Sequence, residues 1–248
     1  FFPFLRVVAR FLVRLLPGDE KVLPLWPEFL KDEVLEDPAA ALKTVTKEVE
    51  REIVIAEEMY RLAAPLRRSY QEGRRRDVLY IEMVINHLRE EIVAYLRKVS
   101  CHELSPSLSK RLFAYTAMAD DIERLANHIV SLVVLSREKG LREIVFTDFA
   151  EAELDEIEEL VRLNIADAAD LIRQGDGHRR AVVTRRESEI DAAVKRARER
   201  HLVRFHKRLC PAEAGPVFIE MLIHLERISD HCQNIADHVA DLDVPEAP

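Results

Sequence analysis

Hydrophobic residues recur at spacings of three and four along most of this chain, with charged residues between them. The pattern is typical of amphipathic helices, in which one apolar stripe faces a core. The clearest stripe consists of Leu42, Val45, Val49, Ile53, Ala56, Met59 and Leu62. The spacing predicts six long helices, over residues 38–72, 77–99, 107–138, 149–173, 179–208 and 213–241.

Residues with special backbone preferences mark several ends of these helices. Pro38 suits the first turn of the first helix, with Asp37 as its cap. Pro65 is expected to kink that helix, because proline lacks an N–H group and clashes with the preceding turn. The sequence Gly-Arg-Arg-Arg at 73–76 is expected to form a turn, and Gly140 to cap the third helix.

A six-residue pattern occurs twice. It reads Glu-Arg-Leu-Ala-Asn-His at 123–128 and Glu-Arg-Ile-Ser-Asp-His at 226–231, an offset of 103 residues. Helix packing does not require these polar types, so the match indicates two related halves. Each half holds three predicted helices and ends in the helix with the pattern. We therefore predict an all-α protein of two tandem three-helix bundles, at residues 38–140 and 147–241.

Composition agrees with a helical protein and excludes several functions. Strand signals are nearly absent, and only 6 of the 248 residues are glycine, so a Gly-rich phosphate loop is missing. No zinc-hydrolase motif or nucleophile set is present, and we do not expect an enzyme. The net charge of −8 argues against nucleic acid as a partner. Three widely spaced cysteines favour a reduced, cytosolic protein with small buried thiols.

The start of the chain differs from the rest. Residues 1–17 are strongly apolar apart from a basic stripe of Arg6, Arg10 and Arg14, which predicts a short amphipathic helix. The segment is too short to cross a bilayer. It is either a signal peptide, a core helix, or the cytoplasmic end of a membrane region upstream, and we favour the third because arginines flank membrane segments on that side. Residues 18–37 are expected to be a linker, and residues 242–248 a tail.

Acidic residues four apart occur on the last predicted helix. Glu226 and Asp230 share a face that should point nearly opposite the apolar stripe. A solvated acidic face is the simplest explanation. Like charges at this spacing weaken a helix, however, and the pattern has a counterpart in the first half, so a shared binding role is the alternative.

The stretches Leu225–Asp230 and Cys232–Ile235 resemble the PhoU family, and the resemblance covers about residues 38–241. It implies two tandem three-helix bundles whose paired Glu/Asp-xxx-Asp motifs bind clusters of metal ions. The apolar, arginine-bearing start, together with residues 38–42 and 47–50, resembles something narrower. This is the cytoplasmic PhoU-like region of bacterial sodium/phosphate cotransporters.

The resemblance also implies a second pair of ligands on the helix before each motif. For the second half, the implied metal ligands are Glu187, Asp191, Glu226 and Asp230. Their first-half counterparts are Glu82, Asn86, Glu123 and Asn127, where asparagine replaces aspartate twice. Hard cations bind amide oxygen less strongly than carboxylate, so we expect the second site to bind iron, zinc or manganese more tightly. The alternative is neutralisation by nearby bases, namely Arg185, Arg186, Lys195 and Arg227.

Histidines recur every seven residues on the last helix, at His224, His231 and His238. They indicate either a pH-sensitive seam, a set of ligands, or an ordinary helix boundary with satisfied nitrogens. We retain His231 and its counterpart His128 as weaker ligand candidates.

The leading expectation is a metal-binding regulatory domain of a phosphate transporter, at the cytoplasmic face of the bacterial inner membrane. Its expected partners are a membrane transporter domain upstream in the same polypeptide and, as a further candidate, a second copy of the chain. Phosphate would be contacted only indirectly. One alternative is a metal-free helical scaffold for protein partners. Another is a di-metal carboxylate enzyme, whose sites use Glu-xxx-His spacing inside the core. Here the acidic pairs are Glu-xxx-Asp or Glu-xxx-Asn on the face opposite the apolar stripe, which disfavours such an enzyme.

Overall fold

The computed structural model describes residues 23–175 and 177–243, and within these ranges it contains helices and no strand. The predicted helix at 1–17, with Arg6, Arg10 and Arg14, lies outside the described residues, as does most of the tail. The long helices are α2 (Pro38–Ala63), α3 (Glu72–Val99), α4 (Pro106–Leu141), α5 (Asp148–Gln174), α6 (Gly177–His206) and α7 (Ala214–Ala240). Three short 3-10 segments accompany them: η1 (Asp32–Val34), η2 (Ala64–Arg67) and η3 (Asp241–Asp243).

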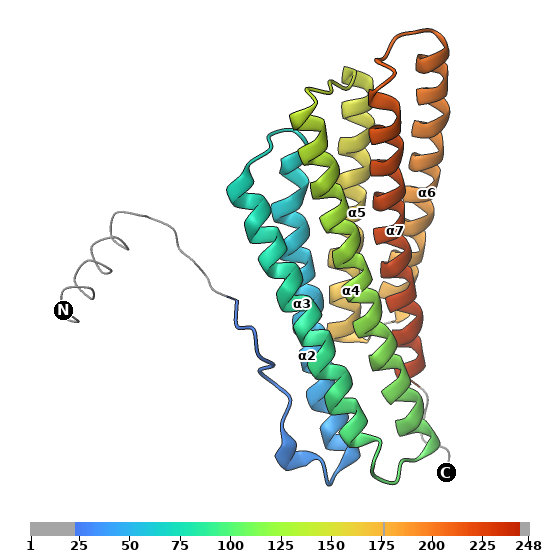
Figure 1. Cartoon of the computed structure of the whole chain (residues 1–248). Helices are drawn as coiled ribbons and strands as arrows, with labels where there is room; N and C mark the ends of the chain where they lie inside the picture. The colour runs from blue at the N-terminus through green and yellow to red at the C-terminus, as the bar shows by residue number, and fades with distance from the viewer. Residues whose placement is uncertain (1–22, 176, 244–248) are drawn as a thin grey trace, which may run out of the picture.

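The six helices run side by side along one elongated molecule (Figure 1). Helices α2, α3 and α4 pack against one another as the first bundle, and α5, α6 and α7 as the second. The bundles meet chiefly through α4 against α7, and also through α2 against α5. The predicted all-α architecture of tandem bundles is therefore confirmed. Among the described residues, no helix combines the length and apolar character needed to cross a bilayer.

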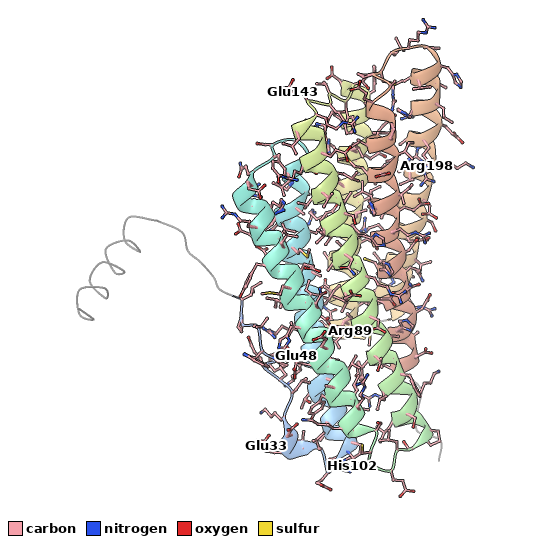
Figure 2. The ribbon with its side chains drawn as sticks, in the orientation of Figure 1. Glu33, Glu48, Arg89, His102, Glu143 and Arg198 are labelled. Atoms are coloured by element: carbon pink, nitrogen blue, oxygen red, sulfur yellow. The ribbon has the colours of Figure 1, made fainter. Side chains whose placement is uncertain are left out.

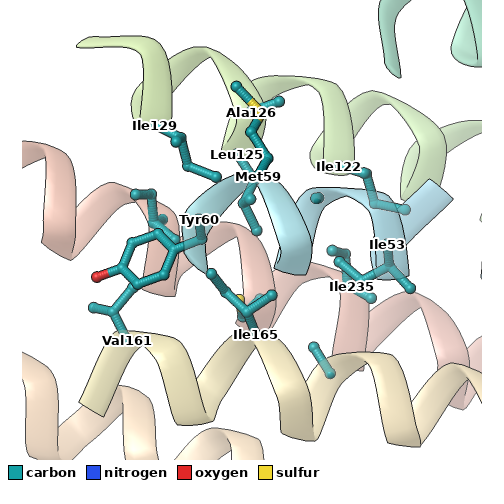
Figure 3. Close-up of a cluster of buried hydrophobic side chains, with 14 of the residues drawn as sticks. Ile53, Met59, Tyr60, Ile122, Leu125, Ala126, Ile129, Val161, Ile165 and Ile235 are labelled. Carbon is teal, nitrogen blue, oxygen red and sulfur yellow. The ribbon is translucent and has the colours of Figure 1, made fainter. Parts of the chain in front are cut away.

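A single hydrophobic core extends through both bundles. Figure 3 shows Ile53 and Tyr60 of α2 beside Ile129 of α4, Ile165 of α5 and Ile235 of α7. All five side chains are fully buried or nearly so. Burying each large apolar side chain contributes about 1.5–3 kcal/mol, so much of the stability of each bundle comes from the other.

The start of α2 follows the sequence signals. Asp37 Oδ1 accepts hydrogen bonds from the N–H groups of Ala39 and Ala40 at 3.0 and 3.1 Å, and Pro38 occupies the first turn. Gly175 ends α5 with a φ of 62°, a left-handed conformation that glycine adopts without strain.

Three helix ends differ from the prediction. Helix α2 ends at Ala63, because Pro65 converts the next residues into the 3-10 turn η2 instead of only kinking the helix. Residues 73–76 are no turn but the first turn of α3, where Glu72 suits the positive end of the helix dipole. Helix α4 continues through Gly140 to Leu141, and Glu143 takes the left-handed conformation, with a φ of 52°.

Residues 23–35, predicted as part of a linker, are bound to the first bundle. We call them the N-terminal strap. The buried carboxylate of Glu48 accepts hydrogen bonds from the backbone N–H groups of Glu28 and Phe29 at 2.9 and 2.8 Å. The hydroxyl of Tyr95 donates to the carbonyl of Lys31 at 2.6 Å. Side chains of α2 and α3 therefore hold this segment through its backbone, which composition alone does not reveal.

Candidate metal centre

Helices α6 and α7 pack against each other and carry the predicted second-half ligands. Glu187 and Asp191 lie one turn apart on α6, and Glu226 and Asp230 lie one turn apart on α7. The face of α7 that bears Glu226 and Asp230 is a flank, not the side opposite the core. Their side chains are only 29% and 35% exposed. Neighbouring helices therefore cover a larger part of the circumference of α7 than the positions of its apolar residues predict.

Three of the four predicted side chains converge. Glu187, Asp191 and Asp230 each offer a carboxylate oxygen, and these oxygens all lie within 4.8 Å of one another. We call these three residues the acidic cluster. Oxygen ligands from two different helices are the kind of set that Mn²⁺, Fe²⁺ or another hard or borderline cation takes.

The acidic cluster carries three carboxylates, of which only Asp230 is paired with a base of the described chain, Arg227. Partial burial raises the pKa of Glu187, and the neighbouring charges of Asp191 and Asp230 raise it further. A hydrogen bond from Ser188 Oγ, at 3.2 Å, opposes this only in part. A bound cation would relieve this repulsion, so the residues present fit a metal ion chemically.

Glu226 lies apart from the acidic cluster. Arg198, two turns beyond Asp191 on α6, donates from Nη2 to Glu226 Oε2 at 2.6 Å. The predicted four-carboxylate site is therefore a three-carboxylate cluster with a fourth acid held by an arginine. The sequence places Arg198 on the correct face, but the pairing depends on how α6 and α7 pack.

Nearby bases neutralise little of the negative charge of the acidic cluster. Only Arg227 of the four candidate bases contacts it, with Nη1 3.2 Å from Asp230 Oδ2. Arg186 pairs with Asp167 at 2.7 Å, and Arg185 approaches Glu189 at 3.7 Å. These partners lie outside the acidic cluster, and Lys195 makes no ion pair with the described residues.

The first half is arranged differently. Asn86 donates from Nδ2 to Glu82 Oε1 at 2.7 Å, and Asn127 donates to Glu123 Oε1 at the same distance. Each amide thus satisfies the carboxylate four residues earlier on its own helix. Compared with aspartate, asparagine at these two positions carries no negative charge, and its amide group hydrogen-bonds to the neighbouring glutamate.

The predicted ligands His128 and His231 belong to the contact between the bundles instead. His231 Nδ1 donates to the buried Asp121 Oδ1 at 2.8 Å, across the α4–α7 contact. Asn234 Nδ2 donates to the same oxygen at 3.1 Å, and His238 Nε2 lies 3.3 Å from Asp121 Oδ2. Asp121 is therefore the acceptor at the centre of an interface network, which consists of Asp121, His128, His224, His231, Asn234 and His238.

The interface network follows the sequence repeat. His128 Nδ1 lies 3.0 Å from His224 Nδ1, and the rings of His128 and His231 stack at 5.5 Å between centroids. The offset of 103 residues relates Asp121 to His224 and His128 to His231. The Asp121–His231 contact is thus the counterpart of the His224–His128 contact. Helices α4 and α7 therefore run antiparallel and are related by a pseudo-twofold axis near the stacked rings.

The network shifts the pKa values of its members in opposite directions. Burial alone would raise the pKa of Asp121, but hydrogen bonds from His231, His238 and Asn234 hold it well below its usual range. Burial and the neighbouring His224 lower the pKa of His128 to about 4. Its hydrogen bond to Asp121 raises the pKa of His238. The sequence pattern does not single out Asp121. Its alignment with His224 in the repeat is the signal that could have identified it.

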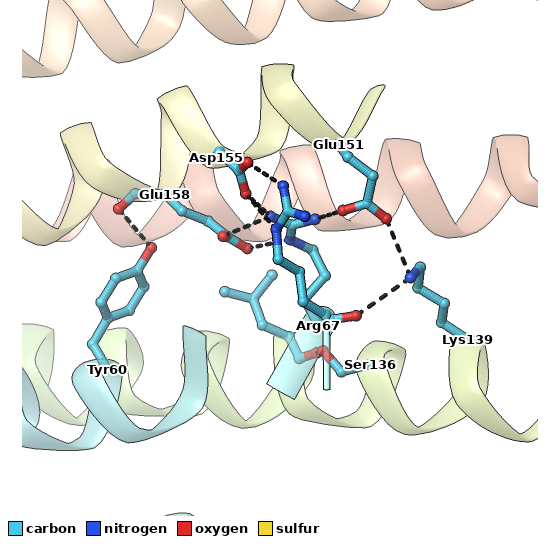
Figure 4. A network of polar contacts seen from close by, with 9 residues as sticks. Tyr60, Arg67, Ser136, Lys139, Glu151, Asp155 and Glu158 are labelled. Carbon is cyan, nitrogen blue, oxygen red and sulfur yellow. Dashed lines mark hydrogen bonds and ion pairs between the residues drawn. The ribbon is translucent and has the colours of Figure 1, made fainter. Parts of the chain in front are cut away.

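A second polar network joins η2 and α4 to α5 (Figure 4). Arg67 is 5% exposed, and its guanidinium binds Glu151, Asp155 and Glu158 on one face of α5. Lys139 Nζ lies 3.3 Å from Glu151 and donates to the carbonyl of Arg67 at 3.3 Å. We call these residues the Arg67 network. The three acids lie at spacings of four and three, so the sequence indicates that they share one face of a helix. It does not indicate that Arg67 is their partner.

Comparisons with known proteins agree with this architecture. Residues 154–239 match the family model described as PhoU domain. The structure of the phosphate transport system regulatory protein PhoU from Streptococcus pneumoniae superposes with a TM-score of 0.73 at 14% identity, covering 84% of this chain and 97% of that one. PhoU from Pseudomonas aeruginosa gives 0.66 at 21% identity, with 85% and 97% covered. No curated protein matches the sequence significantly. Residues 154–239 are therefore similar to the PhoU domain, and the two bundles share the fold of the PhoU structures.

Proposed function

We propose that this chain regulates phosphate transport and that a metal ion at the acidic cluster takes part in that regulation. The observation that carries the proposal is the convergence of Glu187, Asp191 and Asp230 inside the segment that matches the PhoU domain. The printed description of the Streptococcus pneumoniae protein, a phosphate transport system regulator, supplies the process.

The function proposed is control, not catalysis. Carboxylate oxygens from α6 and α7 would hold a cation between the two helices. The positive charge of the cation would offset the repulsion between these carboxylates. Asp230 directly precedes His231, which is bonded to Asp121 of the first bundle. A movement of α7 that accompanies metal binding would therefore reach the contact between the bundles.

The transporter context is part of the proposal. The apolar start of the chain, with Arg6, Arg10 and Arg14, resembles the junction between the membrane region and the cytoplasmic region of sodium/phosphate cotransporters. We infer that this chain acts at the cytoplasmic face of a bacterial inner membrane, next to a transporter domain of the same polypeptide.

Metal titration tests the proposed site. Purified protein, stripped with a chelator, would be titrated with Mn²⁺, Fe²⁺ and Zn²⁺ by calorimetry. Asp191→Asn with Asp230→Asn should weaken binding about tenfold or more, because ligand charge sets the affinity for hard cations. Arg198→Ala should strengthen it, because Glu226 becomes available as a fourth ligand.

The matched control changes the same number of acids in the first half, as Glu82→Gln with Glu123→Gln, and should leave the tight site intact. Equal affinity of the wild type and the Asp191/Asp230 variant would reject the metal site. If no variant binds metal but deletion of the protein still alters phosphate uptake by cells, a metal-free regulatory scaffold is the better description.

A further inference from the structure

The end of α6 exposes apolar side chains to solvent. We call residues 195–209, the end of α6 and the start of its connection to α7, the α6 tip. Leu202, Val203, Phe205 and Leu209 are 55%, 52%, 46% and 61% exposed. Figure 2 shows Arg198 on this part of α6, far from Glu33 and His102 at the other end of the molecule. Exposed apolar side chains gathered in one place indicate a surface that contacts something else.

The α6 tip is also basic, although the whole chain has a net charge of −8. It contains seven lysines and arginines and one acid, Glu199. Four of its arginines pair with acids of the second bundle: Arg196 with Glu156, Arg198 with Glu226, and both Arg200 and Arg204 with Glu153. Lys195, Lys207 and Arg208 form no ion pair with described residues, so their charge is free to act on a partner.

The corresponding part of the first bundle lacks these features. Helix α3 is the middle helix there, as α6 is in the second bundle, and the N-terminal strap binds its end through Tyr95 and Lys98. Within the described chain, no large apolar residue of α3 beyond Met83 is strongly exposed. The fold therefore does not require an uncovered apolar surface at the α6 tip.

The neighbouring α4–α5 connection extends the apolar surface. Phe146 packs on Phe218 at 5.7 Å between ring centroids, and Phe218 packs on His201 of the tip at 5.1 Å. Val145 and Phe149, on either side of Phe146, are 70% and 75% exposed. The α4–α5 connection carries both signs of charge, with Arg142 and Glu143 next to each other, whereas the α6 tip is predominantly basic.

We propose that the α6 tip docks on a bilayer surface that contains anionic lipid. Exposed leucine, valine and phenylalanine between lysine and arginine are the combination that binds at a lipid headgroup boundary, where each basic residue contributes about 1 kcal/mol. The same tip on a second copy carries the same positive charge and would be repelled. Residues 1–16 are basic as well, so they suit the lipid better than they suit the tip. This proposal is independent of the metal site.

Vesicle sedimentation with the full chain tests the proposal. The tip variant combines Leu202→Gln, Leu209→Gln and Lys207→Glu, and the matched control combines Phe113→Gln, Val134→Gln and Lys47→Glu at exposed positions elsewhere. Vesicles of phosphatidylglycerol with phosphatidylcholine should bind the wild type and the control equally. They should bind the tip variant about tenfold more weakly. High salt should release the wild type, because screening removes the attraction.

Several outcomes would overturn the proposal. Equal binding of the wild type and the tip variant would assign any lipid binding to other residues. Equal binding to pure phosphatidylcholine would remove the role of lipid charge. A dimer in solution that only the tip variant loses would assign the surface to a second copy. If thermal unfolding shows that the triple variant is destabilised, Lys207→Glu alone provides the same comparison at an exposed position.

Discussion

Asp121 carries a negative charge into the contact between the two bundles, where two histidines and an amide hold it. Its depressed pKa keeps it ionised throughout the physiological pH range, so its stabilising contribution is present above the unfolded value of about 4. In the same network, the hydrogen bond to Asp121 raises the pKa of His238, whereas burial lowers the pKa of His128 and of His224. A single buried residue therefore makes the bundle contact sensitive to the protonation of its neighbours.

His128 should make the folded protein less stable in mild acid. Folding lowers its pKa from 6.5 to about 4, so the unfolded chain binds more protons between these values and stability falls as the pH falls through that range. The raised pKa of His238 acts with the opposite sign, adding stability that is lost as the pH rises through its folded value. His128→Gln should reduce the fall in melting temperature between pH 7 and pH 5 by about 2–4 °C.

Thermal unfolding followed by circular dichroism measures this effect. His206→Gln, at an exposed position on the α6 tip, serves as the control for removing a histidine. A slope that stays the same in His128→Gln would show that the His128–His224 contact does not govern the acid response.

At the scale of elements, the junction of η2 with α5 is held by one buried arginine. Burial alone would lower the pKa of Arg67, but its bonds to Glu158, Glu151 and Asp155 raise it, so the guanidinium stays charged. Among the described residues, Arg67 is the one cation that binds all three acids of α5, whereas Lys139 reaches only Glu151 and Arg68 only Asp155, so the junction should be most sensitive to the loss of Arg67.

Arg67→Met should destabilise the protein by about 3–5 kcal/mol, because it leaves carboxylates close together and partly buried without their cation. Urea denaturation measures the change in the free energy of unfolding. Arg68→Ala is the control. Arg68 is 55% exposed and bonds only Asp155 in this network, so its loss should cost less than about 1 kcal/mol. Similar losses for the two variants would show that the buried network adds no special stability.

The sequence predicts the helices well where local physics decides and poorly where contacts between helices decide. Asp37 and Pro38 mark the start of α2 correctly, because capping and proline geometry act within one turn. Residues 73–76 were assigned to a turn on composition, but they extend α3. The strap was invisible as a bound segment, since its partners are backbone groups held by Glu48 and Tyr95 from distant parts of the chain.

For the candidate site, too, local spacing is predicted correctly and contacts between helices are not. The spacing of four placed Glu187 with Asp191 and Glu226 with Asp230, and three of these acids converge. The capture of Glu226 by Arg198 depends on the relative rotation of two packed helices, which no local pattern encodes. The same applies to Arg67, whose partners lie more than eighty residues away.

At the scale of the whole molecule, the two bundles share one core and should unfold together. Ile53, Ile129, Ile165 and Ile235 come from both bundles and are fully buried in the joined molecule. We expect one cooperative transition in urea for the full chain, and a fragment of residues 147–243 that is markedly less stable than the intact protein. Two separate transitions, or an equally stable fragment, would show that the bundles are independent domains.

The pseudo-twofold axis beside His128 and His231 also bears on how such a chain can arise. A single three-helix unit with this face would pair with a copy of itself about the same axis, and every contact would then occur twice. Joining two units in one polypeptide frees the paired positions to diverge, so that Asp121 forms a charged contact on one side while its counterpart His224 forms a neutral one on the other. Duplication thus converts a symmetric self-association into a fixed asymmetric joint, in which one half can retain the acidic cluster while the other replaces its acids by amides.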